Sequence, residues 1–408
     1  MHHHRPKSLL PSWTASALGA ALLLTSAALQ AAPYTPAQDS QVLQTLPSRA
    51  ADPTARELAA LRAAAAKAPA DPAPAAALAQ RYFDQALAQG DPRYVGYAEA
   101  VVSRFAAPLP VPLLALRGVL RQYRHDFAGG LQDFADTLAL DPGYAMAHAW
   151  RGAIFLVQAD YAAAQKECEA LRRLGRSTLA GGCLGLAQAY GGQLQSGYAT
   201  LQTALRQTSD PDNRLWLLTR LGEVAAWRGQ VAQAQAHYRE ALSLGRDDVY
   251  LLAAWSDFLL DAGQNAEVER LLSTWTSADS LLLRLAEAQT ALKQPEAARH
   301  RQMLADRFAA ARARGDTTHR AEEARFELRL RGDAATALRL AQDNYAVQRE
   351  PRDARVLLEA AMAAKSPDGA QAARDWLQRS SFEDARTRQL AQLPAQASAR
   401  PGPAGATR

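Results

Sequence analysis

The sequence predicts an all-α fold, a solenoid of stacked helix-turn-helix repeats, and three observations support this prediction. Alanine is abundant and strand-favouring residues are sparse in a chain that is 48% hydrophobic. Short turn signals containing Gly, Asp or Gln recur about every 34 residues. Segments with apolar residues at helical spacing flank these signals. A period in this range indicates repeats that each bury an apolar face on a neighbour.

Nine turn signals define the period. They are Gly90-Asp91, His125-Asp126-Phe127, Ala159-Asp160-Tyr161, Gly192-Gln193-Leu194, Gly229-Gln230-Val231, Gly263-Gln264, Lys293-Gln294, Gly332-Asp333 and Pro367-Asp368. Measured between their Asp or Gln residues, the steps are 35, 34, 33, 37, 34, 30, 39 and 35 residues. A repeat stack needs no central core, so the sequence predicts one elongated domain.

Residues 1–31 resemble a secretory signal peptide. Arg5 and Lys7 are basic, and residues 15–29 form an uncharged apolar stretch that is short for a membrane span. We expect cleavage after Ala31; cleavage one residue later and a retained N-terminal anchor are the alternatives. Because no cysteine lies near the cleavage point, a bacterial lipid anchor is not expected. The chain is therefore predicted to be periplasmic or secreted, with no membrane span after cleavage.

The remaining chain divides by composition. Residues 32–56 are polar and contain four prolines, which predicts a leader of low order. The solenoid is expected over residues 57–392, with an alanine-rich capping helix at its start, over Arg56–Lys67, and the best repeats over 111–278. Residues 393–408 are expected to be a disordered tail.

Asp-Pro dipeptides predict several helix starts. Aspartate can accept hydrogen bonds from the free N–H groups of a first helical turn, and proline is tolerated at the first position. The dipeptide occurs at 52–53, 71–72, 91–92, 141–142 and 210–211, with Glu350-Pro351 as a variant. Each is expected to begin a helix.

Apolar spacing predicts the paired helices of the central repeats. The pairs are 113–124 with 127–140, 145–158 with 161–174, 215–228 with 231–244, and 249–262 with 265–275. After residue 279 the pattern weakens, and a second helix over 295–314 runs long.

These repeats resemble the tetratricopeptide repeat family, whose unit is a helix-turn-helix of about 34 residues. The repeat at 215–248 carries Leu218, Leu221, Gly222, Ala234, Tyr238 and Ala241 at family positions 4, 7, 8, 20, 24 and 27. Other repeats place Gly118 with Phe134, and Gly185 with Leu201, at positions 8 and 24. The resemblance implies a right-handed solenoid in which small residues let two helices approach closely.

The chain has two cysteines, Cys168 and Cys183. The family register places them on helices that pack on each other, within disulfide range. The bond would close a loop of 16 residues, for which chain entropy gives about 3 kcal/mol. Export favours a disulfide; two buried free thiols and a metal site are the alternatives.

The resemblance also implies a concave groove lined by the first helix of each repeat. The positions that face it hold mainly aromatic and acidic residues, namely Tyr123, Tyr190, Trp216, Glu223, Trp227, Tyr250, Asp257, Asp261 and Glu287. The family's carboxylate clamp of Lys, Asn and Arg is missing, so a basic or aromatic peptide segment is the expected ligand. In the alternative interpretation, Trp216 and Trp227 pack between helices.

Charge and motifs exclude several function classes. The chain has 41 Arg and 5 Lys, and the excess of Arg after residue 295 is interspersed with acids, which is typical of a solvated mixed face rather than a nucleic-acid surface. No His-Glu-x-x-His, Gly-x-Ser-x-Gly or phosphate-loop pattern occurs. We therefore expect no enzymatic activity, no metal, no cofactor and no nucleic-acid partner.

The sequence favours a non-enzymatic periplasmic scaffold or adaptor that binds a protein or peptide through the groove. The alternative is a helical accessory module of a system that processes or exports peptidoglycan or another cell-wall polysaccharide.

Overall fold

A computed structural model describes Gln38 and residues 52–392, which contain helices and no strand. The first helices are α2 (Pro53–Lys67), α3 (Pro72–Gln89), α4 (Arg93–Val102), α5 (Val111–Tyr123), α6 (Phe127–Leu140), α7 (Ala145–Val157), α8 (Tyr161–Arg173), α9 (Ser177–Tyr190), α10 (Leu194–Arg206) and α11 (Pro211–Trp227). Then follow α12 (Val231–Ser243), α13 (Val249–Asp261), α14 (Asn265–Leu272), α15 (Asp279–Ala291), α16 (Glu296–Ala313), α17 (Arg320–Phe326), η2 (Glu327–Arg331), α18 (Ala334–Tyr345), α19 (Pro351–Ala363), η3 (Pro367–Ala370), α20 (Gln371–Ser380) and α21 (Ala385–Gln392). None of these helices combines the length and the apolar composition needed to cross a membrane. The predicted signal peptide, most of the leader and the tail lie outside the described residues.

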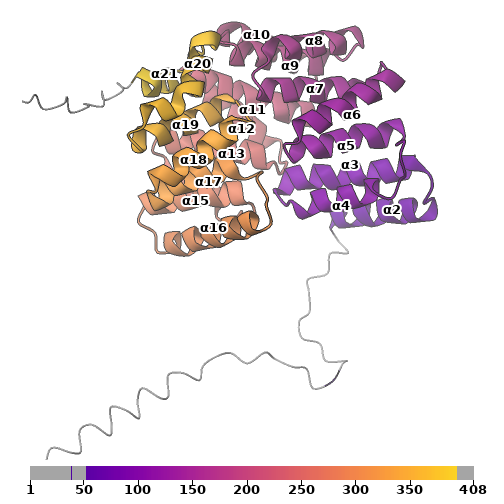
Figure 1. Ribbon diagram of the computed structural model, residues 1–408, viewed down its shortest axis with the longest axis horizontal. Coiled ribbons are helices and arrows are strands. Elements are labelled where there is room, and N and C mark those ends of the chain that lie inside the picture. The colour runs from indigo at the N-terminus through magenta and orange to yellow at the C-terminus, as the bar shows by residue number, and fades with distance from the viewer. Residues whose placement is uncertain (1–37, 39–51, 393–408) are drawn as a thin grey trace, which may run out of the picture. The chain divides into compact units, whose positions relative to one another are not determined.

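From Arg56 onward the helices belong to one compact unit of consecutive hairpins, α3 with α4 through α19 with α20, followed by α21 (Figure 1). The observed helices match the predicted pairs closely, except that α11 begins four residues early, at Pro211. Helix α16 is long, as predicted. All nine turn signals lie between the two helices of a hairpin, so the all-α repeat fold is confirmed.

Each of these nine turns contains one residue with a left-handed backbone. The residues are Gly90, His125, Ala159, Gly192, Gly229, Gly263, Lys293, Gly332 and Lys365. Glycine adopts this conformation without steric cost, which explains why it recurs in the turn signals. Asp126, Asp160 and Asp333 then cap the second helix by accepting a backbone N–H. The left-handed residue reverses the chain, and the aspartate caps the next helix. Together they explain why Gly and Asp recur in the turn signals.

The Asp-Pro prediction is correct at four of six positions. Helices α2, α3, α11 and α19 begin at the proline. At 91–92 the helix begins one residue later, at Arg93. At 141–142 the prediction is wrong, because α7 begins only at Ala145. The Asp141 side chain there accepts the N–H of Gly143, and its carbonyl accepts that of Tyr144, so it stabilises a turn before the helix.

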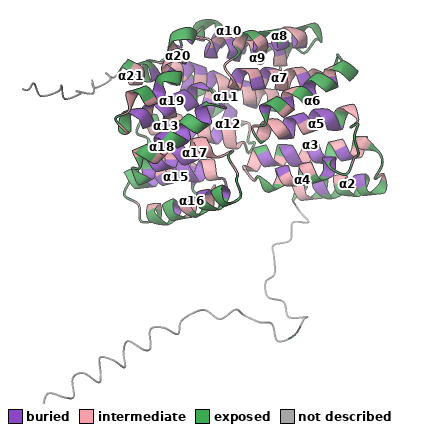
Figure 2. Ribbon diagram, viewed as in Figure 1, coloured by how far each residue is buried: buried purple, intermediate pink, exposed green. Residues whose placement is uncertain are grey.

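Close approach within hairpins confirms the repeat register. A Cβ atom at Gly118 would lie 2.7 Å from Cε1 of Phe134, and one at Gly222 would lie 2.7 Å from Cε1 of Tyr238. Buried side chains lie mainly where helices face one another, and the outward faces are exposed (Figure 2). Glycine at position 8 therefore lets the bulky residue at position 24 fill the space between the paired helices.

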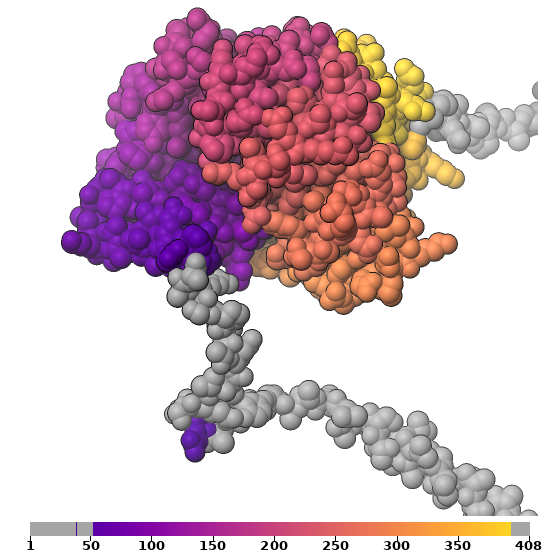
Figure 3. All heavy atoms as spheres, turned by 180° about the vertical axis from the view of Figure 1, so that it is seen from behind, coloured from indigo at the N-terminus to yellow at the C-terminus, as the bar shows by residue number. Residues whose placement is uncertain are grey.

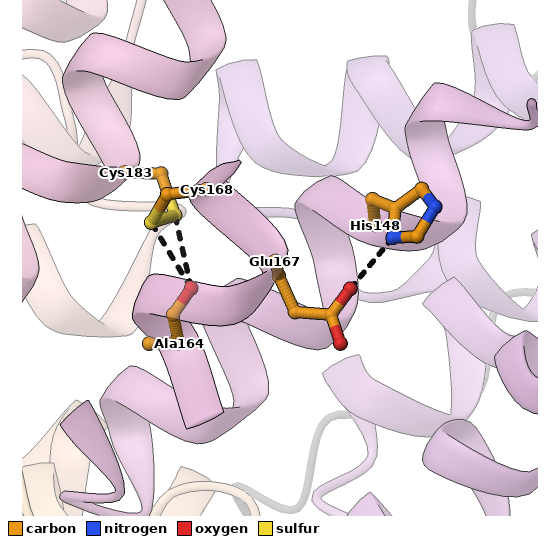
Figure 4. Close-up of a disulfide and its surroundings, with 5 residues drawn as sticks. All are labelled: His148, Ala164, Glu167, Cys168 and Cys183. Carbon is orange, nitrogen blue, oxygen red and sulfur yellow. Dashed lines mark hydrogen bonds and ion pairs between the residues drawn. A yellow bond between two sulfur atoms is a disulfide. The ribbon is translucent and has the colours of Figure 1, made fainter. Parts of the chain in front are cut away.

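A disulfide joins Cys168 on α8 to Cys183 on α9, with an S–S distance of 2.03 Å and Cα atoms 5.5 Å apart (Figure 4). The predicted pairing is thus present in the structure. Nearby, Glu167 pairs with Nδ1 of His148 at 2.6 Å, which ties α8 back to α7.

The solenoid curls until distant parts of the chain touch. The Gln89 amide at the end of α3 donates to Asp247, and the backbone N–H of Arg349 donates to the carbonyl of Val157 at 2.7 Å. From behind, the yellow C-terminal residues lie beside the magenta central ones (Figure 3). The helical unit is therefore curled on itself, and the expectation of an elongated domain is corrected. The inner faces of α11, α13 and α15, each the first helix of its repeat, contact later segments of the same chain.

We predict that Gly222→Ala destabilises the protein by about 2 kcal/mol, because the new Cβ would overlap the buried Tyr238 ring. Gly96→Ala on α4 is the matched control, since its Cβ would meet no atom within 4 Å. The control should be neutral or stabilising by up to about 1 kcal/mol, because alanine favours helix. Urea unfolding of both variants measures the difference, and equal stabilities would contradict the packing described here.

Candidate interaction site

Seven of the nine predicted groove residues come together on the inner faces of four helices. Their positions are Tyr190 on α9, Glu223 and Trp227 on α11, Tyr250, Asp257 and Asp261 on α13, and Glu287 on α15. The C-terminal helices α17, α19 and α21 contact this surface from the opposite side. We call these seven residues, with the helices that carry them, the inner surface.

Two predicted groove residues do not join the inner surface. Tyr123 packs edge-on against Phe83 in the N-terminal core, with ring centroids 6.0 Å apart. Trp216 lies over Gly182 of the preceding repeat, so closely that a Cβ there would be 2.1 Å from the indole ring. For Trp216, packing between helices is therefore the correct interpretation.

Asp257 binds two arginines. Nη2 of Arg284 and Nη1 of Arg325 each lie 2.6 Å from a carboxylate oxygen of Asp257. Burial alone would raise the pKa of Asp257, but the two guanidinium groups outweigh it and hold the pKa well below its usual range. Arg325 also binds Glu287 through Nε at 2.6 Å and Nη2 at 2.9 Å. One arginine of α17 thus joins α13 to α15.

Asp261 makes a second cluster of charges. Arg355 of α19 binds it through both terminal nitrogens at 2.6 Å, and Nη1 of Arg386 on α21 lies 2.6 Å from the same carboxylate. Burial opposes the charge of Arg355, yet its pKa stays above the usual range because Asp261 and Glu359 are ion-paired with it. A cavity of about 370 Å³ lies between these groups.

Aromatic rings form the other half of the inner surface. The Tyr250 hydroxyl donates to Glu223 at 2.7 Å, and the guanidinium of Arg220 stacks 4.1 Å from the Tyr250 ring centroid. Trp227 meets Tyr190 edge-on at 5.8 Å between centroids. The ring of Phe382, which follows α20, lies 5.3 Å from that of Trp227. The inner surface therefore holds an aromatic side chain as well as arginines.

A buried acidic pair lies at the start of α19. The backbone N–H of Glu350 donates to Asp353, and the Asn344 amide donates to the other oxygen of Asp353 at 3.0 Å. Burial raises the pKa of Asp353 to about 7, although the charge of Arg352 opposes this. Arg352 also lies 2.9 Å from Glu350 and faces the Tyr250 ring.

Four side chains at this junction were not identified from the sequence: Arg325, Arg355, Phe382 and Arg386. The available signal was the excess of Arg after residue 295, which was interpreted as a solvated face. That interpretation is wrong for Arg325 and Arg355, whose side chains are only 19% and 25% exposed. Their partners lie 68 and 94 residues away, beyond the reach of a repeat pattern.

The inner surface and the C-terminal segments on it interact through arginine cations and aromatic rings. The acids of the inner surface are ion-paired with arginines, and its aromatic rings pack edge-on against one another. Among residues 52–392, no cluster of three His, Cys, Asp or Glu side chains has the arrangement of a metal site. Such a surface can bind guanidinium and aromatic groups of a polypeptide.

Similarity to known proteins is found among solved structures alone. No protein-family model matches the chain, and no curated protein matches it. Among solved structures, a tetratricopeptide repeat protein from Parabacteroides merdae is 16% identical, with a TM-score of 0.41 over 57% of this chain and 91% of that one. Yeast Tom70 is 14% identical, with a TM-score of 0.41 over 82% of this chain and 62% of Tom70. Human IFIT1 is 12% identical, with a TM-score of 0.44 over 80% and 86%.

The hairpins themselves define the fold as tetratricopeptide-like. Consecutive repeats pair a small residue at position 8 with a packed side chain at position 24, as in Gly185 against Leu201. A helical repeat fold of this kind is typical of proteins that bind other proteins through extended surfaces.

We predict that Asp257→Asn lowers the unfolding free energy by about 2 kcal/mol at pH 7, because Arg284 and Arg325 lose a shared counter-charge. The folded pKa of Asp257 is depressed, so its contribution is present above the unfolded value near 3.9 and is lost as the pH falls below it. Chemical denaturation from pH 8 to pH 3 should show a constant difference that shrinks below about pH 4.

The matched control for this prediction is Glu267→Gln, which removes an exposed pair with Arg270 on α14. Its effect should stay within about 0.5 kcal/mol. If Asp257→Asn behaved like this control, the inner-surface charges would contribute nothing to stability.

The raised pKa of Asp353 gives the opposite pH dependence. The folded protein holds this proton up to about pH 7, whereas the unfolded chain releases it near 3.9. Stability from this group is therefore full at low pH and is lost as the pH rises through about 7. The difference in unfolding free energy between wild type and Asp353→Asn should shrink from pH 5 to pH 8. A difference that does not change over this range would show that Asp353 is ionised throughout.

Proposed function

We propose that this protein is a non-enzymatic periplasmic scaffold that binds a protein or peptide partner carrying a basic or aromatic segment. One observation carries the proposal: the inner surface already binds helices of this chain through arginines and a phenylalanine. That is the chemistry expected of a partner from the acidic and aromatic composition of these positions. Recognition within the chain thus supports this choice of ligand.

Export has independent support. Residues 1–31 have the charge pattern of a signal peptide, and the two cysteines of the chain form a disulfide. Structural disulfides persist in oxidising compartments and are rare in reducing ones. Repeat architecture then favours a role in assembling proteins of the cell envelope rather than in turnover.

Two measurements test the proposal. Intact mass of the protein from its native envelope should correspond to a chain beginning at Ala32, with both cysteines resistant to alkylation until reduction. Immobilised full-length protein should capture a saturable partner from envelope extract, and excess free protein should compete for it. An unprocessed chain with free thiols would refute export, and the absence of a saturable partner would refute the scaffold.

A further inference from the structure

The last described segment, residues 381–392, contacts the inner surface mainly through a few anchoring side chains. The segment comprises a linker and α21, which has eight residues, of which only Thr387 is buried. The segment lies on the surface proposed above to bind partners, so its role rests on that proposed function.

Phe382 is the first anchor. Helix α20 ends at Ser380, and the left-handed backbone of Ser381 turns the chain inward. The Phe382 side chain is 1% exposed and lies between Trp376, at 5.1 Å, and Trp227, at 5.3 Å between ring centroids. Trp227 belongs to the inner surface, so the linker inserts one aromatic ring into it.

Arg386 is the second anchor, four residues after Phe382. Its Nη1 lies 2.6 Å from Asp261, which also binds Arg355. The side chain of Arg386 is 44% exposed and that of Asp261 is 33% exposed, so water reaches this ion pair. An exposed pair contributes little to stability and exchanges readily.

The segment leaves room beside it. A hollow of about 580 Å³ is bounded by Leu194, Trp227 and Arg228 on one side and by Asp384 and Arg386 on the other. Within the segment only Phe382 and Thr387 are fully buried, and only Leu390 and Ala391 add partly buried apolar packing against the core. A segment that is otherwise exposed belongs to the part of a protein that opens at low free-energy cost. Partner-binding elements are drawn from such regions.

We propose that residues 381–392 are a displaceable occupant of the inner surface, and that the partner presents the same pattern: an aromatic residue in a non-helical segment, followed four residues later by an arginine in the first turn of a helix. The aromatic side chain takes the place of Phe382 against Trp227, and the arginine takes the place of Arg386 on Asp261. The partner is a basic and aromatic polypeptide segment.

A labelled peptide copying residues 379–392 tests this by fluorescence anisotropy on the full-length protein. Phe382→Ala in the protein weakens its own segment and should strengthen peptide binding at least tenfold over wild type, whereas Arg386→Ala removes only an exposed ion pair and should strengthen it roughly threefold. Asp261→Asn added to Arg386→Ala should weaken binding roughly threefold. Arg386→Ala removes only a partly exposed side chain and serves if Phe382→Ala fails to fold.

Peptide variants supply the matched controls. Replacing the residue equivalent to Phe382 by alanine should abolish binding, and replacing the one equivalent to Arg386 should weaken it roughly threefold. Replacing the exposed Gln389 should leave binding unchanged. At a peptide concentration of roughly 1 mM, which matches the effective concentration of the tethered segment, hydrogen exchange should show that the peptide accelerates exchange in residues 381–392 of wild type and not in residues 111–278.

Three outcomes overturn the inference: equal binding to wild type and both variants, no binding to any of them, or protein variants that dimerise by exchanging their own segments. If the peptide does not bind but the protein captures a saturable envelope partner, the displaceable segment is refuted and the proposed scaffold is supported. If the peptide binds as expected and no envelope partner exists, the inference holds and the proposed scaffold falls.

Discussion

The close approach of two helices in each hairpin is the constraint on which the architecture depends. Gly118 against Phe134 and Gly222 against Tyr238 leave no space for a Cβ atom. Repeated approach of this kind fixes a similar rotation between successive repeats, and these rotations accumulate into superhelical curvature. Here the curvature is tight enough that α3 meets the chain near Asp247, and α7 meets it near Arg349. The inner faces of the repeats consequently enclose charges that would otherwise be solvated.

Enclosure changes what the inner charges must do. A carboxylate removed from water costs several kcal/mol unless a counter-charge and hydrogen bonds replace its hydration. Asp257 and Glu287 meet this requirement through Arg325, whereas Asp261, which water still reaches, is paired with Arg355. These arginines come from helices that follow the acids by tens of residues. The acids of the central repeats and the arginines of the last repeats are therefore one electrostatic unit, although the sequence separates them.

That separation explains which features the sequence could predict. The turns, most helix starts and the disulfide depend on residues close in the chain or one repeat apart, so pattern and family register identified them. The inner surface was predicted as a set of residues, but its occupant was not. Contacts such as Tyr161 to Trp376 span 215 residues and depend on the superhelical radius, which no local pattern encodes. Asp141-Pro142 failed for a different reason: the same capping chemistry also stabilises an isolated turn.

A tethered occupant sets the requirement that a partner must meet. A segment held by a short linker competes at an effective concentration of roughly 1 mM. A partner at about 1 μM that made only the contacts of Phe382 and Arg386 would therefore occupy about one site in a thousand. Displacement needs added contacts, and the hollow of about 580 Å³ beside Arg386 provides unfilled surface for them. The segment therefore sets a minimum affinity for partners. Basic sequences that bind more weakly are excluded, and only a partner that also fills the space beside α21 displaces it.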